Sequence, residues 1–125
     1  MNKAQRAPSA DGGRTLAKAV INAATLLGLS QSELAPILGL SPATISRMAN
    51  GEYALDEGAK PWEFAALFVR MFRSLDALVG SNAEQARVWL RSTNRAFGAP
   101  PKKLIVNTEG LVRVVHYLDS ARGLN

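Results

Sequence analysis

The stretch from Gln31 to Gly51 constrains this chain most, because its spacing reads as a helix, a tight turn and a second helix. Ser30 precedes the first helix as an N-cap, and Glu33 stands three residues later to complete a capping box. Gly39 interrupts the apolar pattern where the chain must turn, which predicts a positive φ. Ser41 then caps the second helix, whose first position is a proline.

The second helix of this stretch carries small and hydrogen-bonding side chains opposite its apolar residues, Ile45 and Met48. Short side chains suit base edges in the major groove, and hydroxyl and guanidinium groups suit phosphates. We therefore predict that the DNA-binding residues are Gln31, Ser41, Ala43, Thr44, Ser46 and Arg47. A helical hairpin without a role in nucleic-acid binding is the alternative interpretation.

The elements SQSELA, LGLS and ATISRMANG of this stretch resemble the Xre-type helix-turn-helix of phage-repressor-like regulators. This resemblance implies a DNA reader that docks its second helix in the major groove. The formal net charge of +5 and the sequence pI of about 10.1 agree with a polyanionic partner.

Composition excludes several classes of function. The chain has no cysteine, which rules out disulfides and thiolate metal sites and suits a cytoplasmic location. No apolar run reaches membrane-spanning length, and the N-terminus lacks a signal-peptide hydrophobic region, so we expect no membrane association. His116 is the single histidine, and no residue pattern places a base beside a nucleophile. We therefore expect no enzyme activity, no catalytic residue, no metal, no cofactor and no small-molecule substrate.

Helical periodicity runs through the chain from residue 14 onward and predicts an all-α fold, an N-terminal helix-turn-helix bundle followed by a second helical domain. Residues 1–13 hold Pro8 and the pair Gly12-Gly13 with little to bury, which predicts a disordered N-terminal arm. That arm either adds phosphate contacts or is only a frayed terminus. Residues 14–60 form the predicted DNA-binding domain, in which Arg14 and Lys18 either touch the DNA backbone or face solvent.

Residues 61–80 form a long helix whose apolar positions spread wider than one face of a surface helix needs. We interpret it as a dimerisation helix, because a DNA reader of this type usually needs two half-sites. The dimerisation residues predicted from this pattern are Phe64, Phe68, Met71, Phe72 and Leu75. The alternative is a central helix of a monomeric bundle.

Residues 81–125 contain the patterns A-x-x-WL, N-R-A-F, P-P-x-x-L and T-x-x-G-L-x-x-V-x-x-Y-L, from Ala86 to Leu118. They resemble the toxin-binding domain of Xre/MbcA/ParS-type antitoxins, with Phe97 where the pattern more often has leucine. The resemblance implies an antitoxin that neutralises a RES-domain toxin, which attacks cellular NAD, and that represses its own operon. The partners it implies are that toxin, operator DNA and a second copy of the chain. An Xre-type repressor whose second half only dimerises is the alternative.

Between Glu84 and Glu109 the chain carries no acid, and Arg87 and Arg91 share one helical face. The basic patch predicted there consists of Arg87, Arg91, Arg95, Lys102 and Lys103. That patch would meet an acidic partner protein, DNA phosphates or only solvent. The tail offers Arg122 to a partner's cleft, unless it is a frayed end. The toxin-binding residues that we predict are Lys102, Lys103, Arg122, Gly123, Leu124 and Asn125. We also expect the chain after residue 52 to hold enough apolar residues to fold without the first half.

Overall fold

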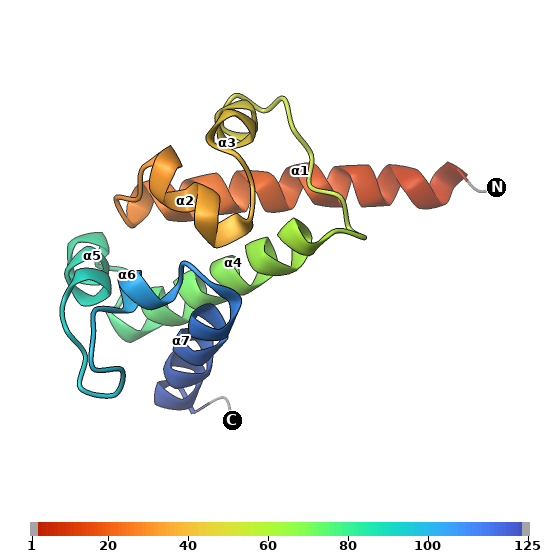
Figure 1. Ribbon diagram of the computed structural model, residues 1–125. Coiled ribbons are helices and arrows are strands. Elements are labelled where there is room, and N and C mark those ends of the chain that lie inside the picture. Colours follow the sequence, from red (N-terminus) through yellow and green to blue (C-terminus); the bar gives the residue numbers. More distant parts are fainter. Residues whose placement is uncertain (1–2, 124–125) are drawn as a thin grey trace.

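The computed structural model describes residues 3–123, with side chains from Asp11 onward, as seven helices without a β-strand (Figure 1). This arrangement confirms the predicted all-α fold. The helices in chain order are α1 (Lys3–Leu26), α2 (Gln31–Leu38), α3 (Pro42–Ala49), α4 (Lys60–Leu78), α5 (Ala83–Arg91), α6 (Pro101–Leu104) and α7 (Thr108–Ala121).

Helix α1 is longer than the sequence predicts, since it begins at Lys3 instead of residue 14. The prediction of a disordered arm is therefore wrong for residues 3–13, while residues 1–2 lie outside the described part of the chain. A glycine at position 13 serves packing here and not flexibility, because a Cβ on Gly13 would collide with the backbone carbonyl of Leu55. The Leu55 N–H in turn donates to the Gly13 carbonyl oxygen at 3.3 Å, which fastens the α3–α4 linker to α1.

The helix-turn-helix forms as its local signals predict. The Ser30 hydroxyl accepts a hydrogen bond from the Glu33 N–H at 3.1 Å, and the Glu33 carboxylate accepts one from the Ser30 N–H at 2.9 Å. This reciprocal pair confirms the capping box on α2. Gly39 ends α2 with φ of 70°, and Ser41 caps α3 by accepting from the Thr44 N–H at 3.2 Å.

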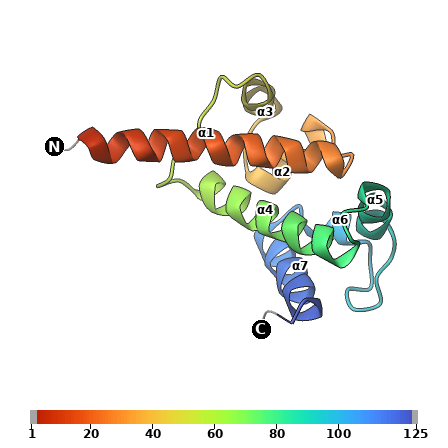
Figure 2. The same cartoon turned by 180° about the vertical axis from the view of Figure 1, so that it is seen from behind.

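Helix α4 lies at the centre of the molecule, with α1 and α2 on one side and α7 on the other (Figures 1 and 2). Phe68, Met71 and Leu75 are fully buried inside this single chain. The prediction of a dimerisation face built on these residues is therefore wrong, and only Phe64 and Phe72 are partly exposed. The physical reason is that each half of the chain covers one apolar side of α4, so no wide apolar surface is left for a second copy.

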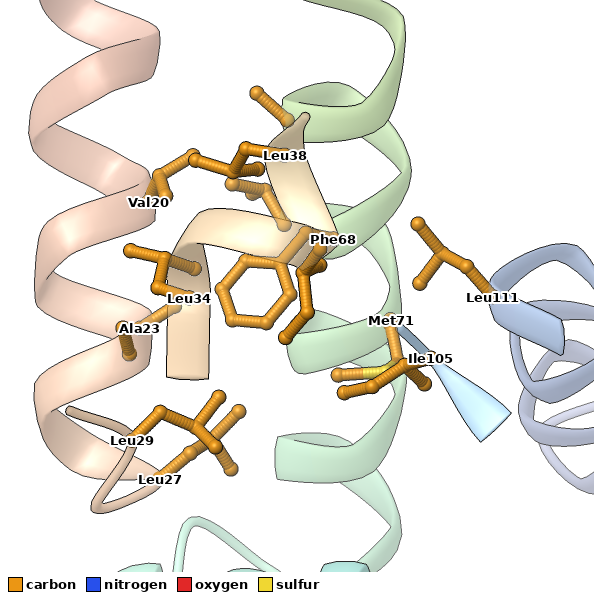
Figure 3. Close-up of a cluster of buried hydrophobic side chains, with 14 of the residues drawn as sticks. Val20, Ala23, Leu27, Leu29, Leu34, Leu38, Phe68, Met71, Ile105 and Leu111 are labelled. Atoms are coloured by element: carbon orange, nitrogen blue, oxygen red, sulfur yellow. The ribbon is translucent and has the colours of Figure 1, made fainter. Parts of the chain in front are cut away.

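The core is continuous from one half of the chain to the other. Figure 3 shows Phe68 of α4 beside Leu34 of α2, with Met71 of the same helix near Ile105 and Leu111 from the second half. Removing the first half would expose the Phe68 side of α4 to water. This shared core argues against the expectation that the chain after residue 52 folds alone.

Polar side chains and a single bridge hold the connections of the second half. Asn82 caps α5, since its side-chain oxygen accepts from the Gln85 N–H at 3.0 Å. Ser81 adopts a positive φ of 62° and donates its hydroxyl to Asp76 at 3.0 Å. Residues 94–97 form a turn that is closed by a single bridge between residues 94 and 99.

Candidate functional site

The polar face of α3 is at the surface, where the sequence predicts it. Ile45 and Met48 point into the core with exposed fractions of 0% and 3%. The six predicted DNA-binding residues all keep solvent access, those most open to solvent being Gln31, Ser41, Ala43 and Arg47, and the half-buried ones Thr44 and Ser46. Five of them lie at the start of α3 or along it and form an exposed face around α3, namely Ser41, Ala43, Thr44, Ser46 and Arg47, while Gln31 is exposed at the start of α2.

Two hydroxyls on this face are already engaged within the chain. The Ser41 oxygen accepts from the Thr44 N–H and lies 3.0 Å from the Thr44 hydroxyl. Ser41 therefore serves first as the helix cap, and its hydroxyl holds that of Thr44 in a defined position at the start of α3. A side chain that is already ordered loses less conformational entropy when a ligand binds.

Arg47 has a neighbour that the sequence reasoning missed. Its guanidinium carbon lies 5.6 Å from the centre of the Tyr53 ring, a cation–π contact that orients the cation along the exposed side of α3. Arg14 and Lys18 of α1 line a depression of about 440 Å³ with Tyr53 and Asn50. The basic groups of α1 and α3 thus border one surface, which suits contact with phosphates.

The basic patch of α5 has a structural role that none of the three sequence interpretations included. Arg87 donates to the Leu26 carbonyl at 3.0 Å, and Arg91 donates to the carbonyls of Leu27 and Gly28, both at 2.9 Å. These acceptors are at the C-terminal end of α1, where carbonyls lack helical partners and a positive charge is favourable. Arg87 and Arg91 therefore cap α1 from the second half of the chain.

A second contact between the halves involves Lys102, one of the predicted toxin-binding residues. Its ammonium forms an ion pair with Glu33 of α2. The hydrogen bond from Lys102, followed by that from the Ser30 N–H, lowers the pKa of Glu33 to about 2. Lys102 is thus engaged within the chain, whereas the neighbouring Lys103 is exposed and has no ion pair among the described residues. We call the contacts of Arg87, Arg91 and Lys102 the seam.

Arg122 is held to the body of the protein, which corrects the prediction of a free arginine on a flexible tail. Its guanidinium donates to the Ser74 hydroxyl at 3.0 Å, and that hydroxyl donates to Asp119 at 2.8 Å. The second Asp119 oxygen lies 2.5 Å from a guanidinium nitrogen of Arg70, as an ion pair outside hydrogen-bond alignment. Gly123 is exposed after this anchor, and the predicted residues Leu124 and Asn125 lie outside the described part of the chain.

Several residues of the C-terminal pattern build an aromatic cluster. The Tyr117 ring stacks on Trp89 with ring centres 6.3 Å apart and meets Phe97 edge-on at 5.1 Å. Arg113 covers the Phe97 ring at 5.3 Å and donates to the Ala96 carbonyl at 3.0 Å, which fixes the turn before α6 onto α7. Phe97, the departure from the usual leucine, is thereby accommodated as an aromatic partner.

Exposed apolar side chains are the surface feature that the sequence reasoning did not single out. Val88 and Val106 are 58% and 46% exposed, although both stand in helical or turn segments next to core residues. Their sequence signal is an apolar residue out of phase with the buried positions. Within residues 3–123, no helix is both long and apolar enough to span a membrane, and no group of three or more candidate ligands is placed to hold a metal.

Comparison with known families gives two matches that together cover most of the chain. Residues 7–70 match the antitoxin Xre-like helix-turn-helix domain. Residues 74–123 match the antitoxin Xre/MbcA/ParS C-terminal toxin-binding domain. No curated protein sequence matches the chain. The first match alone spans more than half of the residues, so the chain belongs to the Xre-type antitoxins, with a helix-turn-helix domain followed by a toxin-binding domain.

Proposed function

We propose that this antitoxin neutralises a RES-domain toxin that degrades NAD, and that it represses its own operon in the cytoplasm through α3. The observation that carries the proposal is the match of residues 74–123 to a toxin-binding domain, directly after a helix-turn-helix domain. The resemblance of residues 81–125 to the antitoxins of RES toxins supports the identity of the toxin.

The DNA part of the proposal rests on the exposed face around α3. Arg47 is oriented by Tyr53 and is the cation of that helix, so Arg47→Ala should weaken operator binding on all sequences. Thr44→Ala should instead relax sequence preference by about 1–3 kcal/mol if the side chain reads a base edge. Gel shifts with the promoter fragment measure both effects, and unchanged shifts for both variants would remove α3 from the interface.

A homodimer remains part of the proposal, although the buried Phe68, Met71 and Leu75 of α4 do not supply its surface. A helix-turn-helix reader with a palindromic operator binds as a dimer with half-sites about one helical turn apart. The partly exposed Phe64 and Phe72 and the exposed Leu78 are apolar side chains on α4 that stay accessible. Sedimentation at and above the concentrations used for DNA binding tests this part, and a monomer bound to a full palindrome would contradict it.

The toxin part of the proposal assigns contact to the surface around Lys103 and to the chain end. Lys103 is exposed without an ion pair among the described residues, and it lines an apolar depression with Val106. Because Arg122 is anchored to Ser74, the contact proposed between the tail and a toxin cleft starts at Gly123. Lys102 contributes only if the toxin replaces its partner Glu33.

The test is NAD consumption by the purified RES protein encoded beside this chain, with intact antitoxin or with antitoxin lacking residues 123–125. Full inhibition by the intact chain is expected, and restored NAD loss with the truncated chain would show that the tail occupies the cleft. Full inhibition by the truncated chain would reject the tail while keeping toxin binding by the domain. Absence of inhibition by the intact chain would reject the proposed toxin.

The second candidate function is a repressor whose C-terminal half only dimerises. The match of residues 74–123 to a toxin-binding domain favours the antitoxin over this candidate. Co-purification of the neighbouring gene product with the full chain distinguishes the two candidates.

A further inference from the structure

A cleft with a volume of about 610 Å³ lies between α1, α4 and α7. It shares no lining residue with the face around α3 or with the Lys102–Glu33 contact of the seam. One of its walls is apolar and includes Leu16 of α1 and Trp62 and Ala66 of α4. The volume is in the range of clefts that bind ligands or peptide side chains.

The other end of the cleft is strongly cationic. Arg70, Arg73 and Arg122 line it, and the one carboxylate among the lining residues is that of Asp119. Three guanidinium groups facing one carboxylate leave two positive charges uncompensated at this end. Arg73 is exposed and has no hydrogen bond or ion pair within residues 11–123.

Asp119 positions two of these three arginines. It is fully buried, its two oxygens face Ser74 and Arg70, and Ser74 in turn receives Arg122. Arg70 and Arg122 are therefore held at fixed places on the rim, while the Arg70 side chain is still 59% exposed. Cations held in position lose less entropy when they bind an anion than freely moving ones do.

These features define the ligand by its chemistry. A guanidinium group pairs with a carboxylate through two parallel hydrogen bonds. Arginine and tryptophan are among the residue types that contribute most to binding energy at protein interfaces. The apolar wall beside the cations suits an apolar side chain next to a carboxylate, a combination that a nucleic-acid backbone lacks.

We propose that this cleft is a docking site for an acidic segment of a partner protein, in which a carboxylate binds Arg73 and Arg70 and a neighbouring apolar side chain packs on Trp62. The proposal goes beyond toxin contact through Lys103 and the tail, because it adds a protein-binding surface that includes α1 and α4. It does not depend on the identity of the toxin.

The probe is the capped peptide Leu-Glu-Glu-Leu, titrated into the isotope-labelled full chain and followed by NMR. The expected result is a saturable shift of the Trp62 indole and Arg73 amide signals, with no shift from the matched peptide Leu-Gln-Gln-Leu. Arg73→Glu should weaken binding about tenfold or more. Ala66→Gln narrows the cleft at its apolar wall without a change of charge, so it should weaken peptide binding as well.

The matched control is Arg95→Glu, the same charge change at an exposed arginine of the second half that does not line the cleft. Equal weakening by Arg95→Glu would reduce the effect to general charge attraction and overturn the proposal. Equal binding of the glutamine peptide, or of inorganic phosphate at the same signals, would also overturn it. Unchanged peptide binding by Ala66→Gln would overturn it too. An Arg73→Glu variant that loses self-association but still binds the peptide would assign the cleft to a second copy and would likewise overturn the proposal.

Discussion

The two halves of this antitoxin use their cations differently. In the helix-turn-helix half, Arg47 is exposed and contacts the Tyr53 ring, and Arg14 and Lys18 of α1 are exposed as well. In the toxin-binding half, Arg87 and Arg91 bind carbonyls at the end of α1. The first half presents its positive charge outward, and the second half uses much of it to bind the rest of the chain.

This difference teaches that a count of basic residues does not locate a binding surface. Arg113 and Arg122 are also engaged within the chain, with the Ala96 carbonyl and with Ser74. Among the described residues of α4 and of the second half, the exposed cations without an ion pair or hydrogen bond are Arg73, Arg95 and Lys103. Arg70 joins them as a paired cation that is still 59% exposed. The halves therefore form one body with separate exposed faces, and the following variants test that description.

The largest effect is expected at Phe68, which lies in the core shared by the halves. Phe68→Ala should lower the free energy of unfolding by about 3–5 kcal/mol, because it leaves a cavity between α4 and α2. Urea unfolding of single-tryptophan versions, with either Trp62 or Trp89 retained, should give the same midpoint for both probes. Two separate midpoints would show that the halves unfold independently.

A smaller effect is expected at the seam. Arg91→Met should lower the free energy of unfolding by about 1–2 kcal/mol, because the carbonyls of Leu27 and Gly28 lose a charged donor. Arg95→Met is the matched control and should change stability by less than about 0.5 kcal/mol. If Arg91→Met and Arg95→Met lower the unfolding free energy equally in urea, the hydrogen bonds from α5 to the end of α1 make no specific contribution to stability.

The smallest effect concerns the Lys102–Glu33 ion pair and its dependence on pH. The pKa of Glu33 is lowered to about 2, so the stabilisation is complete above its ordinary pKa and is lost as the pH falls towards 2. Because Glu33 is partly exposed, the loss should stay below about 1 kcal/mol. Glu33→Gln keeps an acceptor for the capping box, and its unfolding free energy should lack this acid-dependent part. Lys102→Met should reduce the same part, and an unchanged pH profile in both variants would contradict the coupling.

Local features of the fold were predictable from the sequence. The capping box of Ser30 and Glu33, the turn at Gly39 and the cap at Ser41 each depend on residues a few positions apart. Their hydrogen bonds are made within one helix end, so a short stretch of sequence contains all partners. The exposed polar face of α3 follows from the same local periodicity.

The failures all depend on distant partners. The periodicity of α4 shows that it has apolar residues on several sides, but not that the same chain covers Phe68 and Met71. Arg91 and its acceptor Leu27 are 64 residues apart, and no local pattern predicts that contact. Gly13 likewise looks like a flexible position until the backbone of Leu55 is placed against it.

Separate exposed faces for DNA and toxin on one folded body are tested most directly by two variants, each of which should impair one activity and spare the other. Arg47→Ala should bind the operator more weakly in a gel shift yet inhibit NAD consumption by the RES toxin as fully as the unmodified chain. A chain with Lys103→Glu and without residues 123–125 should bind the operator normally and fail to inhibit the toxin. If either variant is impaired in both activities while its urea midpoint is unchanged, the two functions share one surface, which contradicts separate faces for DNA and toxin.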